Sequence, residues 1–336
     1  MCLQSFSSTK MKIWISHLSN HMCFASLKCV LHHLSGNNLL TSNHQGGLTG
    51  ILVQGSNGEA QHLSCDERKE TIRFTRKTLD ENGFENVIII AGTGVQSTRE
   101  TKKLCADACE AGAAYALVLT PSTWPPQMTK DNIIRFHREV RSIHQIVVNR
   151  LYILRLILKV ADASPIPTMI YNFPRVTAGI DLDSSIITEL AAHPNIVGVK
   201  LSCGNIGKLH RITTDTKPSE FAVFTGRSDV LSQGLLSGST GGIVALANIA
   251  PKIHTKLFKL WKEGKQEEAM KIQATLGHGD WAVSKIGGIS GVKAVVNKEF
   301  GYGNGRVRGP LAPTDLGVGA EVYKLVDDLM ALEKTL

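Results

Sequence analysis

The feature that most constrains this chain is a recurring alternation of short apolar runs and longer stretches of helical period, which begins at residue 47. The apolar runs are rich in Val, Ile and Leu and end in Gly, Pro or small polar residues, as buried strands do. Repeated strand–helix units predict a parallel sheet, either closed into a barrel or open and doubly wound. The predicted strands span residues 48–55, 86–92, 114–121, 167–174, 195–202, 221–226 and 241–248.

Two of the intervening stretches carry signals for helix ends. Residues 64–83 begin with Ser64, and Glu67 follows three residues later, a spacing that predicts a capping box. Residues 97–112 begin with a Ser-Thr pair and end at Gly112, which is typical of a helix terminus. Both stretches are therefore predicted to be helices that connect parallel strands.

The chain length favours the closed barrel over the open sheet. A (β/α)₈ barrel needs about 250 residues, which residues 47–313 supply once the atypical stretch 141–159 is set aside. An open nucleotide-binding sheet would need a GxGxxG turn after its first strand, and "GSNGEA" and "GTGVQS" are only fragments of one. We therefore predict an α/β fold, a (β/α)₈ TIM barrel over 47–313, followed by a C-terminal helix over 314–336. The eighth strand should precede residue 47, and the first strand and helix are expected to be missing or replaced in the atypical segment 1–46.

Composition excludes several classes of protein. The net charge is +8, but the two segments without any Asp or Glu, residues 1–46 and 141–159, hold +7 of it. A nucleic-acid-binding protein would spread its basic residues over one folded face, so no nucleic-acid partner is expected. No apolar run is long enough to span a bilayer, and no membrane partner is expected either. The 7 cysteines form no CxxC pair, which favours a reducing compartment over disulfides or a zinc site.

Small polar residues follow the first predicted strand. The sequence "GSNGE", residues 55–59, supplies free backbone N–H groups just ahead of a helix, an arrangement that suits a carboxylate or a phosphate. A tight turn with no ligand is the plain alternative. Tyr171 in "IYNFP" ends another strand at the same mouth of the predicted barrel. A packed aromatic ring is the alternative there.

A lysine interrupts the apolar strand "NIVGVKLS", residues 195–202. Val197, Val199 and Leu201 are spaced by two and predict one buried face, so Lys200 should point to the opposite side, the interior of the barrel. Desolvation favours the neutral form of a buried lysine, and a neutral amine in a pocket is what Schiff-base chemistry requires. Together, the amine, the phenol and the anion-binding turn indicate a substrate with a carbonyl next to a carboxylate, an α-keto acid.

These motifs also carry a resemblance to a known family. From about residue 47 to 313 the chain resembles the dihydrodipicolinate synthase/N-acetylneuraminate lyase superfamily of class I aldolases, and within it 4-hydroxy-2-oxoglutarate aldolases and fungal 2-keto-3-deoxy acid aldolases. The motifs that match in order and spacing are "GSNGE", "YNFP", "GVKLS", "GRSDVLSQGLLSGSTGGIVALANIAP", "GISGVKAVV" and "GYGNGRVRGPL".

The resemblance implies a (β/α)₈ barrel and a role for each matching residue. Lys200 would form the Schiff base and Tyr171 would relay the proton. Ser56 would act as a relay hydroxyl, with Ser56 and Asn57 holding the pyruvyl carboxylate, and Ser202 would contact the distal part of the substrate. The implied activity is a lyase that cleaves a hydroxylated 2-keto acid, a small-molecule partner, to pyruvate and an aldehyde, without metal or organic cofactor. A homo-oligomer, dimer or tetramer, is expected.

Two positions depart from the pattern of the synthases in this family. Those enzymes carry an arginine five residues after the strand-end tyrosine, where this chain has Val176, and the adjacent Arg175 has the wrong strand parity. Synthesis of dihydrodipicolinate is therefore the less favoured alternative. The family often has a second tyrosine after the fourth strand, where this chain reads "TPSTWPP", and Thr123 is the candidate that takes its place.

The two acid-free segments leave further alternatives open. Residues 1–46 lack arginine, so a mitochondrial transit peptide is weakly supported and a cytoplasmic location is expected, with the mitochondrion as the alternative. Residues 141–159 are consistent with a basic amphipathic helix at a membrane surface, or more simply with a translated intron. A non-catalytic barrel is the alternative to an active aldolase.

Overall fold

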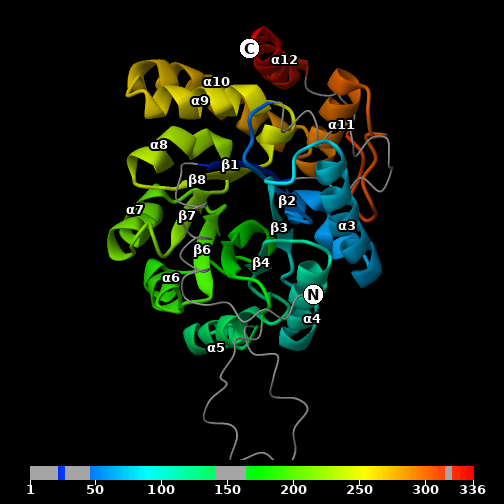
Figure 1. Ribbon diagram of the computed structural model, residues 1–336. Helices are drawn as coiled ribbons and strands as arrows, with labels where there is room; N and C mark the ends of the chain where they lie inside the picture. The colour runs from blue at the N-terminus through cyan, green and yellow to red at the C-terminus, as the bar shows by residue number, and fades with distance from the viewer. Residues whose placement is uncertain (1–21, 27–45, 141–163, 315–319) are drawn as a thin grey trace, which may run out of the picture.

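Eight parallel strands form a closed barrel in the computed structural model, and helices surround it (Figure 1). The structure describes residues 22–26, 46–140, 164–314 and 320–336. Each strand pairs with the next along the chain, and β8 pairs with β1. The strands are β1 (Met22–Ser26), β2 (Gly50–Val53), β3 (Ile88–Gly92), β4 (Tyr115–Leu119), β5 (Thr168–Asn172), β6 (Ile196–Leu201), β7 (Ala222–Thr225) and β8 (Gly241–Val244).

From β2 onward a helix follows each strand, as a barrel requires, and the last four helices gather at one side of it (Figure 1). Strands β2 to β8 lie inside the seven predicted ranges, which confirms the predicted barrel and its C-terminal helices. The helices are α3 (Cys65–Glu81), α4 (Thr98–Glu110), α5 (Lys130–Val140), α6 (Ser184–Ala191), α7 (Ile206–Asp215), α8 (Leu231–Leu236), α9 (Pro251–Lys262), α10 (Gln266–Lys285), α11 (Ile289–Phe300) and α12 (Ala320–Thr335).

Both predicted helix starts are present. The Ser64 hydroxyl accepts a hydrogen bond from the backbone N–H of Glu67, and the Glu67 carboxylate accepts one from the N–H of Ser64, which completes the capping box. The Ser97 hydroxyl caps α4 by accepting a hydrogen bond from the backbone N–H of Glu100. None of the helices in the described part of the chain is long and apolar enough to cross a membrane.

The first strand of the barrel comes from the atypical N-terminal segment. β1 pairs with both β2 and β8, so the expected first strand is replaced by Met22–Ser26 rather than missing. The remainder of that segment up to residue 45, and the whole of the stretch 141–159, lie outside the described residues. The proposed division into 1–46, 47–313 and 314–336 stays a prediction.

Side chains of the barrel separate into an interior cluster and an outer layer beneath the helices. Val199 and Leu201 pack in the outer layer, whereas Val197 packs inside with Tyr171. The predicted shared face is therefore wrong for Val197. The reason is a register shift between β5 and β6, where Thr168 pairs with Ile196 but the next residue pairs with Gly198, so one residue of β6 is passed over.

Candidate active site

A cavity of about 450 Å³ opens where the strands end. Such a volume is in the range of small-molecule sites, and the carboxyl ends of barrel strands are where such sites form. Its walls come from segments after β2, β5, β6, β7 and β8, together with helices α10 and α11. The polar residues that line it are Ser56, Asn57, Tyr171, Arg175, Lys200, Ser202, Arg227, Asp280 and Ser284.

Lys200 and Tyr171 face each other inside this cavity. The two residues are paired across β5 and β6, and the Lys200 Nζ lies 4.5 Å from the centre of the Tyr171 ring. Lys200 is 2% exposed, so its amine is shielded from bulk water yet borders the cavity. The prediction that Lys200 points into the barrel agrees with this arrangement, because the register shift lies before it in the strand.

Lys200 differs from two other enclosed lysines in its partners. The Nζ of Lys208 forms an ion pair with Asp181, and the Nζ of Lys293 forms one with Glu59. None of the ion pairs among the described residues involves Lys200. Of these three lysines, Lys200 is therefore the one whose amine has no carboxylate within ion-pair distance in the described part of the chain.

Ser56 and Asn57 lie in the turn that follows β2. Ser56–Gly58 forms one turn of 3-10 helix, closed by the Gly58 N–H donating to the Gly55 carbonyl oxygen at 2.9 Å. The Ser56 hydroxyl donates to the Tyr171 hydroxyl across a long 3.5 Å contact. Both Ser56 and Asn57 line the cavity. The turn thus presents two polar side chains beside the tyrosine.

Ser202 lies just after β6, and a glycine just after the next strand, β7, makes room for it. The Ser202 N–H donates to the Asn172 carbonyl oxygen at 2.9 Å, which fixes the backbone at the end of the strand. A Cβ atom on Gly226 would lie 2.1 Å from the Ser202 hydroxyl oxygen. Ser202 can therefore hold its place in the cavity wall only because position 226 has no side chain.

Thr123 does not join this group. It lies outside the walls of the main cavity and of a neighbouring cavity of about 260 Å³ that shares Ser56 and Tyr171. Its backbone N–H donates to the Gln96 side chain at 2.8 Å. Five of the six predicted site residues are thus brought together, and their roles stay predictions: Ser56, Asn57, Tyr171, Lys200 and Ser202.

One wall of the cavity contains an arginine that lies between two carboxylates. Neither it nor the carboxylates were predicted from the sequence as site residues. The Arg227 guanidinium contacts Asp229, with its Nε 3.0 Å from Oδ1, and lies 3.7 Å from Asp280. Burial raises the pKa of Asp280 to about 6, and the charge of Asp229 adds to this, while Arg227 opposes it. The motif "GRSD" was visible in the sequence, but Asp280 lies on α10 and nothing local links it to that motif.

Comparison with known proteins assigns the chain to a family. The dihydrodipicolinate synthetase family matches residues 31–150 and 156–329. The chain belongs to this family. The gap in the match, at 151–155, falls within the acid-free stretch 141–159. The predicted resemblance is confirmed.

Three relatives illustrate the similarity. A protein of Emericella nidulans, named as a mitochondrial 4-hydroxy-2-oxoglutarate aldolase, is 42% identical over 80% of each chain. The L-threo-3-deoxy-hexylosonate aldolase of Hypocrea jecorina is 38% identical over 86% of this chain and 87% of its own length. The crystal structure of Escherichia coli YagE in complex with pyruvate is 26% identical, with a TM-score of 0.78, and covers 92% of this chain and 98% of that one.

The position of Arg175 in the structure differs from the one expected from the sequence. Residues Pro174–Val176 form a turn of 3-10 helix rather than a strand, so strand parity does not apply, and both Arg175 and Val176 line the main cavity. The parity argument against Arg175 is therefore wrong. Arg175 is exposed and forms no ion pair with any residue that the structure describes. Its guanidinium is available for an anion at the cavity mouth.

The donor set gives no sign of a metal centre in the described ranges. Among residues 22–26, 46–140, 164–314 and 320–336, no three His, Cys, Asp or Glu residues are grouped so that they could hold a metal ion. The expectation that the chain needs no cofactor stays a prediction. The groups at hand in the cavity are an amine, a phenol, hydroxyls, guanidinium groups and a carboxyl group.

Proposed function

We propose that this chain is a class I aldolase that cleaves a hydroxylated 2-keto acid to pyruvate and an aldehyde. The observation that supports it most is the buried Lys200 amine, which faces Tyr171 in a cavity and has no carboxylate partner among the residues that the structure describes. The names of the relatives support a lyase of this kind, and the pyruvate complex of YagE supports pyruvate as the shared half of the substrate.

In the proposed reaction Lys200 first forms a covalent link to the substrate. Its neutral amine attacks the C2 carbonyl carbon, and loss of water leaves an iminium between Nζ and C2. The iminium withdraws electrons from the C3–C4 bond. The turn that holds Ser56 and Asn57 would bind the neighbouring carboxylate through side-chain and backbone donors.

Tyr171 would then move the proton that permits bond cleavage. Its own proton first passes through the Ser56 hydroxyl to water in the cavity, and the phenolate so formed removes the proton of the C4 hydroxyl. The C3–C4 bond then breaks, and its electron pair forms an enamine on the lysine while the aldehyde leaves. Protonation of the enamine at C3 and addition of water at C2 release pyruvate and regenerate the Lys200 amine. Ser56, whose hydroxyl contacts that of Tyr171, is the proposed relay between the phenol and the cavity. Positioned proton transfer contributes roughly 10²- to 10⁴-fold in rate.

Two substrate classes fit the proposal, and one observation separates them. A dicarboxylate such as 4-hydroxy-2-oxoglutarate would place its second carboxylate toward the cavity mouth, where Arg175 is free of ion pairs with the described residues. A 2-keto-3-deoxy sugar acid would present hydroxyls instead, which suit Ser202 and the carboxyl group of Asp280. We favour the dicarboxylate because an unpaired guanidinium best matches an anionic group.

The synthase reaction is the second candidate, since the presence of Arg175 in the cavity wall removes part of the argument against it. Condensation with aspartate semialdehyde is expected to be slower than cleavage, because the synthase arginine position holds Val176. A non-catalytic barrel is the other alternative. The name of the Emericella relative supports a mitochondrial over a cytoplasmic location. Assembly into a dimer or tetramer stays a prediction.

Trapping with pyruvate and borohydride tests the proposal. Borohydride should reduce the imine and leave one stable adduct, which peptide mass measurement should locate on Lys200. Lys200→Arg should abolish the adduct and the cleavage, because a guanidinium forms no imine. Lys208→Arg is the matched control, since that buried lysine is already ion-paired with Asp181. An adduct on Lys208 or Lys293, or none on the folded chain, would overturn the proposal.

A further inference from the structure

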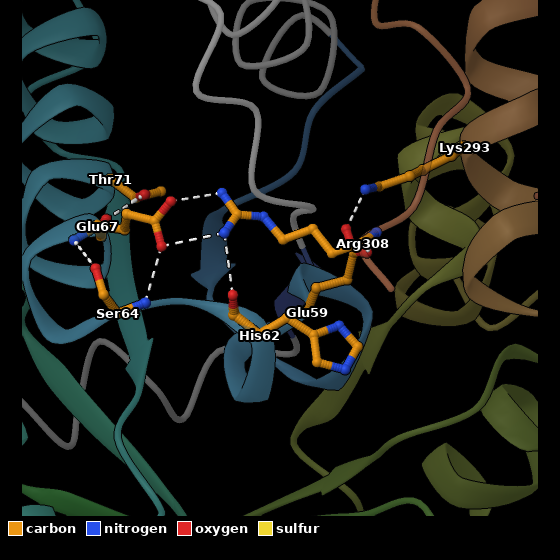
Figure 2. Close-up of polar contacts among 7 residues, drawn as sticks. All are labelled: Glu59, His62, Ser64, Glu67, Thr71, Lys293 and Arg308. Atoms are coloured by element: carbon orange, nitrogen blue, oxygen red, sulfur yellow. Dashed lines mark hydrogen bonds and ion pairs between the residues drawn. The ribbon is translucent and has the colours of Figure 1, made fainter. Parts of the chain in front are cut away.

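A group of charged side chains joins the Ser56 turn to the C-terminal part of the barrel (Figure 2). Glu59 ends the turn, and its side chain is 2% exposed. Its carboxylate accepts hydrogen bonds from the Lys293 Nζ on α11 and from the backbone N–H of Arg308 at 2.7 Å. Because a buried carboxylate without partners is strongly unfavourable, these contacts hold Glu59 in place.

The side chain of Arg308 reaches the start of α3 as well. Figure 2 shows its guanidinium directed at Glu67, to which it donates two hydrogen bonds of 2.6 and 3.1 Å. It also donates to the His62 carbonyl oxygen at 3.0 Å. Glu67 is in turn held by the capping box with Ser64. Only a planar guanidinium has donors spaced for this two-point contact, so lysine would not reproduce it.

This group borders the candidate active site at both ends. The Glu59 N–H donates to the Ser56 carbonyl oxygen at 3.1 Å, and Ser56 lines the cavity. On the other side, Leu311 follows Arg308 by three residues and lines both cavities. The backbone of Glu59 has φ 55°, in the left-handed region that residues other than glycine rarely adopt. The contacts to Lys293 and Arg308 offset that unfavourable conformation.

We infer that Glu59, Lys293 and Arg308 are positioning residues for the active site. They hold the turn in the form in which the Ser56 hydroxyl meets Tyr171. This inference rests on the proposed function, in which Ser56 binds the carboxylate and relays a proton. Glu59 lines the neighbouring cavity of about 260 Å³, but none of the three lines the main cavity that holds Lys200, so each is expected to act through Ser56.

A double-mutant cycle separates this role from a general effect on stability. Arg308→Lys should lower kcat/KM for cleavage by about 10- to 100-fold, as small displacements of reacting groups do. In a Ser56→Ala background the same substitution should change kcat/KM by less than about twofold, because its effect passes through the hydroxyl that is already absent. The rate of pyruvate trapping on Lys200 should show the same pattern.

The matched control is Arg306→Lys, on the same segment. Arg306 is exposed and forms no side-chain ion pair with the residues that the structure describes, so both rates should stay at the wild-type value. If Arg308→Lys fails to fold, Glu59→Gln replaces it in the cycle, since the amide keeps the size and can still accept the Arg308 N–H.

Two results would overturn the inference alone: equal losses in the wild-type and Ser56→Ala backgrounds, or wild-type rates in Arg308→Lys. A wild-type chain that traps no pyruvate would overturn the proposed function and this inference with it. The wild-type trapping measurement therefore distinguishes the two failures. A loss that Arg308→Lys causes only when the Ser56 hydroxyl is present supports the positioning role.

Discussion

The Nζ of Lys200 lies 4.5 Å from the centre of the Tyr171 ring, and the two residues are register partners on neighbouring strands. Because their backbones are hydrogen-bonded into one sheet, the relative position of amine and phenol is set by the barrel rather than by a loop. Replacing Tyr171 by phenylalanine should therefore keep the ring in place and remove only the hydroxyl. This separates the packing role of Tyr171 from its proposed chemistry.

Tyr171→Phe should leave Schiff-base formation intact but slow the cleavage of the bound substrate. Phenylalanine keeps the ring over Lys200, so pyruvate should still be trapped by borohydride. Without the hydroxyl, kcat for cleavage should fall by roughly 10²- to 10⁴-fold. Both quantities are measured on the same preparation. Loss of trapping together with activity would mean that Tyr171 is needed to place the lysine, and undiminished cleavage would exclude it as the proton carrier.

Arg175 allows a test of the distal half of the substrate. Arg175→Gln should lower kcat/KM for 4-hydroxy-2-oxoglutarate by about tenfold, since a hydrogen bond to a charged group contributes about 1.5–3 kcal/mol and part of it is lost to solvent at the cavity mouth. Cleavage of a 2-keto-3-deoxy sugar acid, which has no second carboxylate, should be unchanged and serves as the control. Equal losses for both substrates would exclude Arg175 as a carboxylate receptor.

The strands and caps were predictable because their signals are local. Apolar runs, the Ser64–Glu67 spacing and the glycine-rich strand ends each depend on a few adjacent residues, and β2 to β8 and α3 follow them. The position of Lys200 inside the barrel followed from the same alternation. β1 was not predicted as a strand, because residues 22–26 have no comparable period and owe their place to pairing with β2 and β8.

The residues whose positions were predicted wrongly, or not predicted, share a different cause. Val197 was put on the wrong face because a register shift depends on the neighbouring strand, which the sequence of β6 does not reveal. Arg175 was judged by strand parity in a segment that has already turned into 3-10 helix. Asp280 meets Arg227 only because α10 packs against the segment after β7. Each of these depends on contacts between elements, and none has a local signal.

The acid–base behaviour of Asp280 gives a prediction about stability. Its carboxyl group has a pKa of about 6 in the folded chain, compared with 3.8 as the ordinary value, because burial and the charge of Asp229 disfavour the anion. Between these two pH values the folded state binds more protons than the unfolded state. The free energy of unfolding should therefore fall as pH rises from about 4 to about 6, by roughly 3 kcal/mol from this group.

Asp280→Asn tests this, because asparagine stays neutral and resembles the protonated acid in shape. Arg227 would keep its contact with Asp229, so no charge is left without a partner. Relative to this variant, the free energy of unfolding of the wild type should fall by about 3 kcal/mol between pH 4 and 7. Above that pH the difference between the two proteins should stay constant. Urea unfolding at each pH measures it. Asp328→Asn, which removes an exposed carboxyl group on α12 far from Arg227 in the sequence, is the control and should still show the fall in the free energy of unfolding that the wild type shows. If the wild type instead becomes more stable than Asp280→Asn as pH rises, then Arg227 stabilises the Asp280 anion more than burial opposes it. The wall of the cavity would then carry a fixed negative charge.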